Sequence, residues 1–368
     1  MQSELSHLDT PSLLIDGERM ERNLKEMVAV AADAGVALRP HVKTHKSPSL
    51  ALRQLELGAG GITVAKIGEA EVMADAGIRD IRIAYPIVGE PKMGRLARLM
   101  ERADVSISLD SVETARELSD LGVLIGRRIR ILLKINTGLD RVGILAEEAL
   151  EVARGIDTLP GVQLVGILTH EGHAMKEASR DGARQCAIEA GQTMVKTAER
   201  LREAGFGIEE VSVGSTPTAR DIAYVPGVTE IRPGTYIFND FNEMSVGVAT
   251  EDTCALTVLA TVVSIPSNER AVLDAGSKTL TSDLVGPPSP RKGYGYIKGY
   301  PEITIARLTE EHGILALKDA KRKLKIGQQV EIIPNHVCPV VNLSDVMYLM
   351  KNGVCEGQVE VLARGKNR

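Results

Sequence analysis

The chain has 368 residues, of which 43% are hydrophobic and 25% charged, and it carries a net charge of −5 with a pI near 5.9. This length fits a barrel plus a second domain, and the composition is ordinary for a soluble globular protein. A mildly acidic chain is not expected to bind nucleic acid or an anionic membrane surface. It has no apolar run of about 18 residues, so no transmembrane helix is expected, and the polar stretch 1–10 lacks the features of a signal peptide.

Four cysteines are present, and no two of them form a C-x-x-C pair; they are Cys186, Cys254, Cys338 and Cys355. A disulfide framework is not expected at this length and count. We therefore expect reduced, mostly buried thiols in a cytoplasmic protein. Aromatic residues make up only 3% of the chain and Trp is absent, which argues against a carbohydrate-binding protein.

The first two-thirds of the chain alternates short β-rich runs with amphipathic stretches. Strands are expected at 37–41, 61–65, 80–84, 105–109, 128–135, 162–169, 210–213 and 229–231. Helices are expected at 18–34, 48–58, 66–77, 90–103, 111–121, 145–155 and 178–204. Regular β-then-α alternation predicts a parallel sheet, and eight units over about 200 residues predict a (β/α)8 TIM-type barrel. An open doubly wound sheet is the alternative, although no G-x-G-x-x-G follows an early strand.

After about residue 242 the pattern changes to strands with few helix signals between them. Strands are expected at 252–266, 270–273, 295–298, 303–308, 329–333 and 358–362. This pattern predicts a C-terminal all-β domain. We therefore expect the barrel at 11–242 and the β domain at 243–368. A short strand at 12–15 precedes the first barrel helix and could join either domain, so residues 1–15 are a candidate addition to the β domain.

Active sites of such barrels lie at the C-terminal ends of the strands. Lys43 follows the first strand, where a lysine pointing into the barrel mouth is suited to form a Schiff base. Burial near other cations would lower the pKa of its amine and favour the deprotonated form. A solvated basic turn is the alternative interpretation. If the strand continues, His41, Lys43 and His45 share one face and Lys46 faces away.

Two further strand ends carry cationic side chains. Arg141 follows the fifth strand and could donate to the ring nitrogen of a cofactor, or it could form a surface turn with Asp140. The sixth strand ends in Thr-His-Glu-Gly-His at 169–173, a candidate acid/base or metal cluster that could also simply cap the loop. His170 is placed to stack on a flat ring.

The loops after the seventh and eighth strands, 214–218 and 232–236, are rich in small and hydroxyl residues. Hydroxyls and free backbone N–H groups suit a phosphate, and barrels of this type often bind phosphate in these two loops. The sequence therefore predicts a phosphate site there.

The β domain carries Pro-Asn-His-Val-Cys-Pro at 334–339. His336 and Cys338, at i and i+2, fall on one side of an extended segment. Imidazole and thiolate together prefer zinc or another borderline-soft divalent metal, although a His-x-Cys pair alone is a weak signal. Cys355 lies on a predicted turn and looks unrelated.

In this order and spacing, these segments resemble the metal-activated D-threonine aldolase and D-serine dehydratase family, which has the alanine-racemase-like fold (pyridoxal phosphate fold type III). The resemblance runs from residues 8–12 to 363–365. Its carriers are RPHVKTHKS (39–47), GLDRVGI (138–144), THEGH (169–173), GSTPT (214–218), RPGTY (232–236), LDAGSK (273–278), EEHG (310–313) and PNHVCPVVNLSD (334–345).

The resemblance implies pyridoxal 5′-phosphate bound through Lys43, with Arg141 facing the pyridine nitrogen and His170 contacting the ring. It implies a homodimer and a divalent metal, manganese or zinc, on His336 and Cys338. The positions that match the family's phosphate-binding loops are Gly214, Ser215, Thr216, Gly234, Thr235 and Tyr236.

The implied reaction is that of a D-threonine aldolase, which cleaves a D-β-hydroxy-α-amino acid to glycine and an aldehyde. His173 is the candidate base for the hydroxyl proton, directly or through water. The alternative is a D-serine or D-3-hydroxyaspartate dehydratase that releases a 2-oxo acid and ammonia, in which Lys43 removes the α-proton. Cys338 favours this alternative, because D-threonine aldolases often show His-x-Asp, whereas the surrounding motifs resemble bacterial aldolases more closely.

Two other functions are disfavoured. A racemase of this fold needs an opposing tyrosine from the second domain, and no convincing match is found. A protein of cofactor homeostasis with a related barrel would have a single domain and need no metal.

Overall fold

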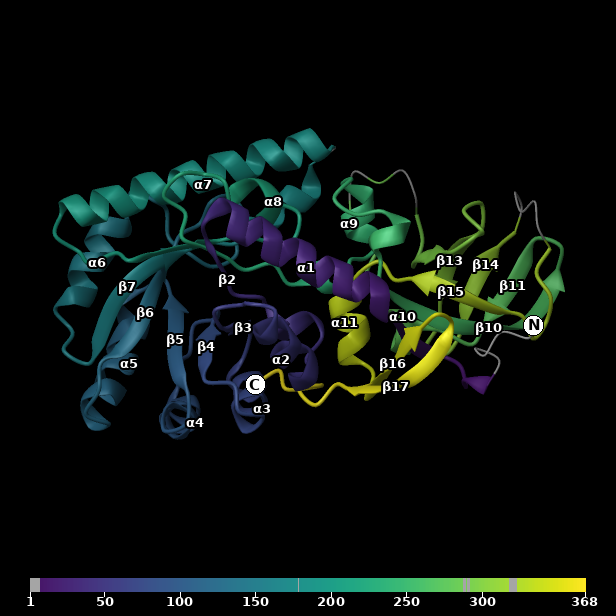
Figure 1. Ribbon diagram of the computed structural model, residues 1–368, viewed down its shortest axis with the longest axis horizontal. Helices are drawn as coiled ribbons and strands as arrows, with labels where there is room; N and C mark the ends of the chain where they lie inside the picture. The colour runs from purple at the N-terminus through teal and green to yellow at the C-terminus, as the bar shows by residue number, and fades with distance from the viewer. Residues whose placement is uncertain (1–6, 178, 287–288, 290–291, 318–322) are drawn as a thin grey trace.

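The structure is a computed structural model that describes residues 7–177, 179–286, 289, 292–317 and 323–368. It has two domains side by side, with the expected barrel at one end and the β domain at the other (Figure 1). Helix α1 (Gly17–Ala34) runs from the second domain to the barrel. Among the helices of the described residues, none combines the length and hydropathy that crossing a membrane requires.

The barrel is a curled sheet of parallel strands in the order β2-β9-β8-β7-β6-β5-β4-β3. Each expected strand is present within a few residues, and the predicted parallel barrel is confirmed. The strands are β2 (Ala37–Leu38), β3 (Ile62–Val64), β4 (Asp80–Ile83), β5 (Asp104–Leu109), β6 (Ile129–Lys134), β7 (Val162–Leu168), β8 (Glu210–Val213) and β9 (Glu230–Ile231). The two ends of the sheet meet at one isolated bridge, between His41 and Thr63, so the barrel closes through the segment after β2.

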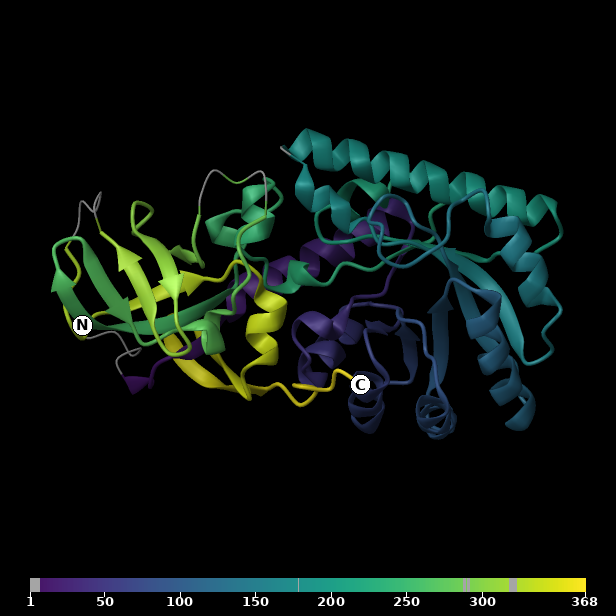
Figure 2. The ribbon, with the colours of Figure 1, turned by 180° about the vertical axis from the view of Figure 1, so that it is seen from behind.

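Helices cover the outside of this sheet, as the β/α alternation predicts (Figure 2). In α1, the Asp16 side chain accepts a hydrogen bond from the Arg19 N–H at the N-terminus, and Gly35 ends the helix with a φ of 69°. The expected apolar face of α1 is buried, including Leu24 and Met27. The other barrel helices are α2 (Pro48–Glu56), α3 (Ile67–Asp75), α4 (Glu90–Met100), α5 (Val112–Leu124), α6 (Ala149–Asp157), α7 (Arg180–Glu203) and α8 (Ala219–Ile222). Residue 178, where the last long helix was expected to begin, lies outside the described residues.

The second domain is the expected all-β unit, a sheet in the order β11-β14-β13-β12-β15-β10-β1-β16-β17. An additional pairing of β10 with β11 closes the first six strands of this order into an antiparallel barrel. The strands are β10 (Leu256–Ser267), β11 (Arg270–Leu273), β12 (Tyr296–Ile297), β13 (Thr304–Leu308), β14 (Gly313–Ala316), β15 (Gln329–Ile333), β16 (Val346–Lys351) and β17 (Val354–Glu360). Strands β14 and β16 were not anticipated from the sequence.

The N-terminal strand β1 (Ser12–Asp16) belongs to this second sheet, although the barrel follows it in the chain. It pairs antiparallel with β10 and parallel with β16. At the other end of the chain, the segment after β17 runs back to the barrel, where the Gly68 N–H donates to the Arg368 carbonyl (Figure 1, Figure 2). The two domains are therefore linked by three crossings of the chain.

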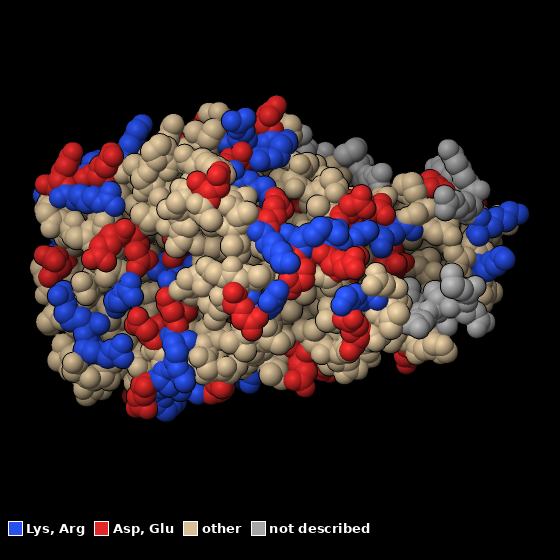
Figure 3. All heavy atoms as spheres, viewed as in Figure 1, with Lys and Arg blue, Asp and Glu red and all other residues tan. Residues whose placement is uncertain are grey.

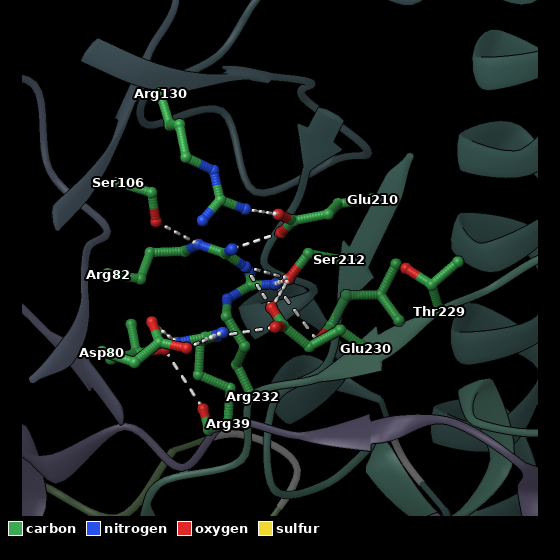
Figure 4. A network of polar contacts seen from close by, with 12 residues as sticks. Arg39, Asp80, Arg82, Ser106, Arg130, Glu210, Ser212, Thr229, Glu230 and Arg232 are labelled. Atoms are coloured by element: carbon green, nitrogen blue, oxygen red, sulfur yellow. Dashed lines mark hydrogen bonds and ion pairs between the residues drawn. The ribbon is translucent and has the colours of Figure 1, made fainter. Parts of the chain in front are cut away.

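The interior of the barrel contains a network of buried charges (Figure 4). The Arg82 side chain, only 1% exposed, forms ion pairs with Glu230 and Glu210. Arg39 pairs with Glu230 at 2.6 Å. Two residues beyond Glu230, Arg232 is hydrogen-bonded to the Ser212 hydroxyl. This network connects the barrel interior to the cavity described below.

On the face of the molecule shown in Figure 3, acidic and basic side chains are interspersed rather than gathered into one basic patch. This distribution agrees with the mildly acidic net charge.

Candidate active site

A cavity of about 470 Å³ opens at the C-terminal ends of the barrel strands, between the barrel loops and the second domain. Most of the predicted site residues line it: Lys43, Arg141, His170, Ser215, Thr216, Gly234, Thr235, His336 and Cys338. Further lining residues were not singled out from the sequence: Arg232, Asp240, Asn242, Glu243, Asp283 and Leu284. Gly214, Tyr236 and His173 are not among the residues that line it.

Lys43 lies in a single 3₁₀ turn, Val42–Thr44, rather than on a continuing strand. The Lys43 N–H donates to the His41 ring at 3.4 Å, and His41 and Lys43 both line the cavity. His45 turns away into the core, where its Nε2 lies 3.2 Å from the Gln54 Oε1 atom. The expectation that His41, Lys43 and His45 share one face is therefore wrong, because the turn after Pro40 ends the strand alternation.

The electrostatic environment of the cavity suits Lys43 as a nucleophile. Burial lowers the pKa of Lys43 below its ordinary value, and Arg141 and Arg232 add to this effect while Cys338 opposes it. Burial, together with Lys43, also holds the pKa of His170 well below its ordinary value. The His170 imidazole is therefore neutral at physiological pH and can pack against an aromatic ring without carrying a charge into the site.

Arg232 is a buried cation on the cavity wall that the sequence interpretation did not single out. It is 5% exposed, and its guanidinium donates to the Ser212 hydroxyl and to the Thr169 and Val213 carbonyls. Within the described residues it forms no ion pair with a carboxylate, although Glu230 lies two positions earlier. A buried guanidinium without a direct counter-ion is costly unless a ligand completes it. Its signal was its place at the head of the RPGTY motif, directly after a strand.

The two predicted phosphate loops face each other, and the Tyr236 N–H donates to the Thr216 hydroxyl at 3.0 Å. A Cβ atom on Gly234 would come within 2.9 Å of the His41 carbonyl, so this position requires glycine. The Gly214 N–H is already bonded to the buried Glu171 carboxylate at 3.1 Å. Gly214 and Tyr236 therefore hold the loops in shape, while Ser215, Thr216, Gly234 and Thr235 present their atoms to the cavity.

His336 and Cys338 also lie together, although not in the predicted extended segment. His336 precedes the short helix α11 (Val337–Asn342), and Cys338 is in its first turn. The predicted i, i+2 extended geometry is wrong, because the chain enters a helix here with Pro339 in its first turn, where proline is tolerated. Both side chains nevertheless line the same cavity. The Cys338 Sγ atom lies 3.3 Å from the Thr44 hydroxyl of the barrel.

The histidine and the cysteine stabilise each other's charged forms. Burial favours a neutral His336, but Cys338 and the neighbouring carboxylates outweigh it and raise the pKa of His336 to about 10. Burial likewise opposes the Cys338 thiolate, but His336 and Lys43 lower the pKa of Cys338 overall. A thiolate is the form in which cysteine binds metals.

Two buried carboxyl groups stand next to this pair, on either side of the start of helix α9 (Phe241–Ser245). Asp240 accepts hydrogen bonds from the Glu243 N–H at 3.1 Å and from the Val337 N–H at 3.0 Å. Burial, and then the charge of Asp240, raises the pKa of Glu243 well above its ordinary value. Among the described residues, the Glu243 Oε2 atom has no hydrogen-bond partner. Burial and the neighbouring Asp240 thus favour the protonated form of Glu243 on the cavity wall.

His173 faces away from the cavity. Its Nε2 atom lies 3.1 Å from the Cys186 Sγ atom, and its Nδ1 atom is buried without a partner among the described residues. The structure thus brings His170 to the cavity wall and leaves His173 behind it, in a 3₁₀ turn over Gly172–Lys176.

Known proteins resemble this chain over both domains. The family model of the alanine racemase N-terminal domain matches residues 15–240, and that of a putative serine dehydratase domain matches residues 255–350. A D-threonine aldolase from Arthrobacter sp is 35% identical over 369 residues, which cover 99% of this chain and 95% of the relative. A D-threo-3-hydroxyaspartate dehydratase from Delftia sp. is 34% identical over 92% of this chain and 93% of its own.

Solved structures agree with the sequence relatives. The crystal structure of a D-threonine aldolase from Filomicrobium marinum superposes with a TM-score of 0.90 at 31% identity, covering 99% of this chain and 98% of that chain. The resemblance therefore includes the arrangement of the two domains that builds the cavity. The chain belongs to the D-threonine aldolase and D-serine dehydratase family of lyases, on the alanine-racemase-like fold.

Proposed function

We propose that this chain is a D-threonine aldolase that depends on pyridoxal 5′-phosphate and a divalent metal, and that cleaves D-β-hydroxy-α-amino acids to glycine and an aldehyde. One observation carries this proposal. A single cavity joins Lys43 of the barrel to His336 and Cys338 of the second domain. An amine suited to a Schiff base and a pair of metal-binding side chains thus reach the same substrate.

The cavity suits pyridoxal phosphate. Lys43 has the lowered pKa that a Schiff-base lysine needs. His170 provides a neutral ring for stacking, and Arg232 provides a buried cation that, among the described residues, forms no direct ion pair. We propose that Arg141 and Arg232 bind the polar edge of the cofactor ring, with Arg141 as the candidate partner of the ring nitrogen. The candidate phosphate-binding groups are Ser215, Thr216, Gly234 and Thr235, held in place by Gly214 and Tyr236.

The donor set at the second domain suits zinc or manganese. His336 and Cys338 supply one nitrogen and one sulfur, a combination that borderline-soft divalent metals accept. Among the described residues, no group of three or more His, Cys, Asp and Glu side chains is arranged to hold a metal ion. Because the pair supplies two ligands, a metal held by it would also bind water or substrate, as metals in catalytic sites do. A D-threo-3-hydroxyaspartate dehydratase that is 32% identical to this chain has been solved as a cysteine-to-alanine mutant in a form named as metal-free.

When bound, pyridoxal phosphate supplies an electron-accepting ring, and the metal lowers the pKa of the substrate hydroxyl. The chain itself must receive the hydroxyl proton. Our candidate for this proton acceptor is His173. Because His173 lies behind the cavity wall, it would receive the proton through a water molecule. Leu139, Met175 and Leu284 give part of the cavity wall an apolar surface that suits an uncharged β-substituent. This surface favours threonine-like substrates over 3-hydroxyaspartate.

A second candidate is a D-serine-type dehydratase. The observation that favours it is Cys338, since the family's dehydratases show His-x-Cys where its aldolases often show His-x-Asp. In that reaction Lys43 would remove the α-proton, and the metal would assist departure of the hydroxide.

We also propose that the enzyme is a homodimer in the cytoplasm. The family supports the dimer. All four cysteines are free in the structure, which is in keeping with a reducing compartment.

Product analysis tests the proposed function. The holoenzyme is incubated with D-threonine and zinc or manganese, with a chelated sample as the control. Glycine and acetaldehyde in the metal-containing sample alone establish the aldolase. 2-Oxobutyrate and ammonia establish the dehydratase instead. Absence of any metal-dependent product from D-threonine or D-serine contradicts both.

A further inference from the structure

Asp283 contacts the proposed metal pair through a loop that neither the family motifs nor the mechanism uses. The loop follows the short helix α10 (Ser277–Leu280) in the second domain. The Asp283 Oδ2 atom lies 3.0 Å from the His336 Nδ1 atom. The main chain of Asp283 is also held in place. The side-chain amide of Asn335, the residue before His336, donates to the Asp283 carbonyl at 2.9 Å. Asp283 is thus attached to two consecutive residues of the facing segment.

These attachments hold Asp283 in a defined position. The Asn335 side chain is 1% exposed, and its amide also donates to the Gly293 carbonyl at 2.7 Å. One buried amide therefore bonds the main-chain carbonyls of both Asp283 and Gly293. Further along, the Gly286 N–H donates to the Asn242 Oδ1 atom at 2.9 Å. A carboxylate anchored in this way differs from a chance ion pair between mobile surface side chains.

The contact also fixes the role of the Nδ1 atom of His336. A carboxylate accepts hydrogen bonds, so the Nδ1 atom facing Asp283 must be the protonated one. With Nδ1 engaged by Asp283, Nε2 is the nitrogen left to bind a metal ion once it is deprotonated. Metal-binding histidines usually donate their second N–H to a carboxylate or carbonyl, which sets the ring orientation and strengthens the metal bond.

We propose that Asp283 is the positioning residue of the metal pair, orienting His336 so that its Nε2 atom and the Cys338 thiolate converge on one divalent cation. This inference rests on the metal site proposed above. As placed, Asp283 lies on the Nδ1 side of the imidazole, away from the metal side, so it acts through His336 and is not a third ligand.

Zinc affinity measured by competition with a chromogenic chelator tests this role without relying on activity. We compare the full-length wild type with Asp283→Asn and Asp283→Ala, each first stripped of metal and reloaded with pyridoxal phosphate. Asp345→Asn is the matched control, since Asp345 pairs with Arg364 at 2.6 Å in the same domain and does not line the cavity. Circular dichroism and the visible cofactor spectrum verify that each variant is folded and loaded.

Asp283→Ala is expected to weaken zinc binding by about 10- to 100-fold, the range for lost outer-shell partners. Asp283→Asn keeps an oxygen that can accept a hydrogen bond from Nδ1, so its loss of zinc affinity is expected to be smaller. The control Asp345→Asn is expected to keep the wild-type zinc affinity. Zinc affinity of Asp283→Ala within about twofold of wild type overturns the positioning role. So does a loss as large as that of Cys338→Ala, which would make Asp283 a ligand. A wild type that binds no zinc overturns the proposed metal site and this inference with it.

Discussion

The Thr44 hydroxyl of the barrel lies 3.3 Å from the Cys338 thiol of the second domain. Thr44 directly follows Lys43, so the turn that carries the proposed Schiff-base lysine touches the proposed metal pair. A side-chain contact between the domains therefore joins the proposed cofactor site to the proposed metal site. A substitution at Cys338 should affect both sites.

Replacing Cys338 with alanine should weaken zinc binding by more than about 100-fold, because a direct ligand matters more than an outer-shell partner. Chelator competition measures this loss. Cys355→Ala, which removes an exposed thiol, should bind zinc as the wild type does. Unchanged zinc affinity in Cys338→Ala would show that the metal binds elsewhere.

Lys43→Ala should abolish the visible absorption of the Schiff base and reduce turnover on the order of 10²- to 10⁴-fold, the effect of losing a positioned proton-transfer group. The proposed role of Lys43 requires a deprotonated amine, which the lowered pKa of the buried side chain favours. Spectra recorded with added pyridoxal phosphate measure the first effect. The exposed Lys176, at the end of the 3₁₀ turn Gly172–Lys176 next to the cavity-lining Met175, provides the control substitution to alanine. A Lys43→Ala protein with wild-type turnover would refute both proposed activities.

Gly234→Ala should reduce the affinity for pyridoxal phosphate, since the added Cβ atom would lie 2.9 Å from the His41 carbonyl and 3.0 Å from the Thr44 hydroxyl. The loop must shift to relieve these contacts, at a cost of about 1–3 kcal/mol in stability. Fluorescence titration of the apoenzyme measures the affinity. At Gly60 a Cβ atom would meet nothing within 4 Å, so Gly60→Ala is the matched control. Equal affinity in both variants would remove Gly234 from the phosphate site.

Glu230→Gln should lower the free energy of unfolding by about 3–5 kcal/mol, because it leaves the buried Arg82 and Arg39 without a shared counter-ion. Denaturant unfolding measures the change. Glu26→Gln removes a carboxylate that is 47% exposed from an ion pair with Arg220, and should cost about 0–1 kcal/mol. Similar losses in the two variants would mean that the network in Figure 4 adds no more than a surface pair.

The titration of Lys134 should contribute to the pH dependence of stability. Burial and the nearby Arg232 and Arg141 lower the pKa of this lysine to about 8. The unfolded chain has an ordinary lysine pKa of about 10.4 and binds more protons between these values, so stability rises with pH from about 8 to 10.4. Lys134→Met should be more stable than the wild type at pH 7 and lack this part of the rise. Unfolding at pH 7 and at higher pH tests this, with the exposed Lys25→Met as control. An identical pH profile in Lys134→Met would contradict it.

Local patterns were sufficient to predict the barrel strands and the long helices from hydrophobic periodicity, whereas the short helix α8 was not predicted. They also placed His170 and Arg141 at strand ends, and both reach the cavity. They misjudged the segments around Lys43 and Cys338, where a turn and a short helix replace extended chain. Pro339, suited to a helix's first turn, was the available signal for the helix.

The rest of the site depends on contacts between residues far apart in the chain. Asp283 reaches the candidate site through its hydrogen bond with His336, 53 positions later in the chain. Asp240 and its neighbour Glu243 are placed there because Asp240 accepts a hydrogen bond from the Val337 N–H. Neither hydrophobic periodicity nor a short motif predicts contacts between residues so far apart in the sequence. His173 shows the converse, since its motif is intact but its ring turns toward Cys186.

The position of β1 between β10 and β16 has a consequence for synthesis of the chain. The ribosome releases this strand before the barrel, and β16 only near the end of translation. β1 therefore emerges without either neighbouring strand. It stays unpaired until the whole barrel has been synthesised. A chain stalled or cleaved at the domain boundary would display β1 as an unpaired edge, the kind of surface from which proteins aggregate.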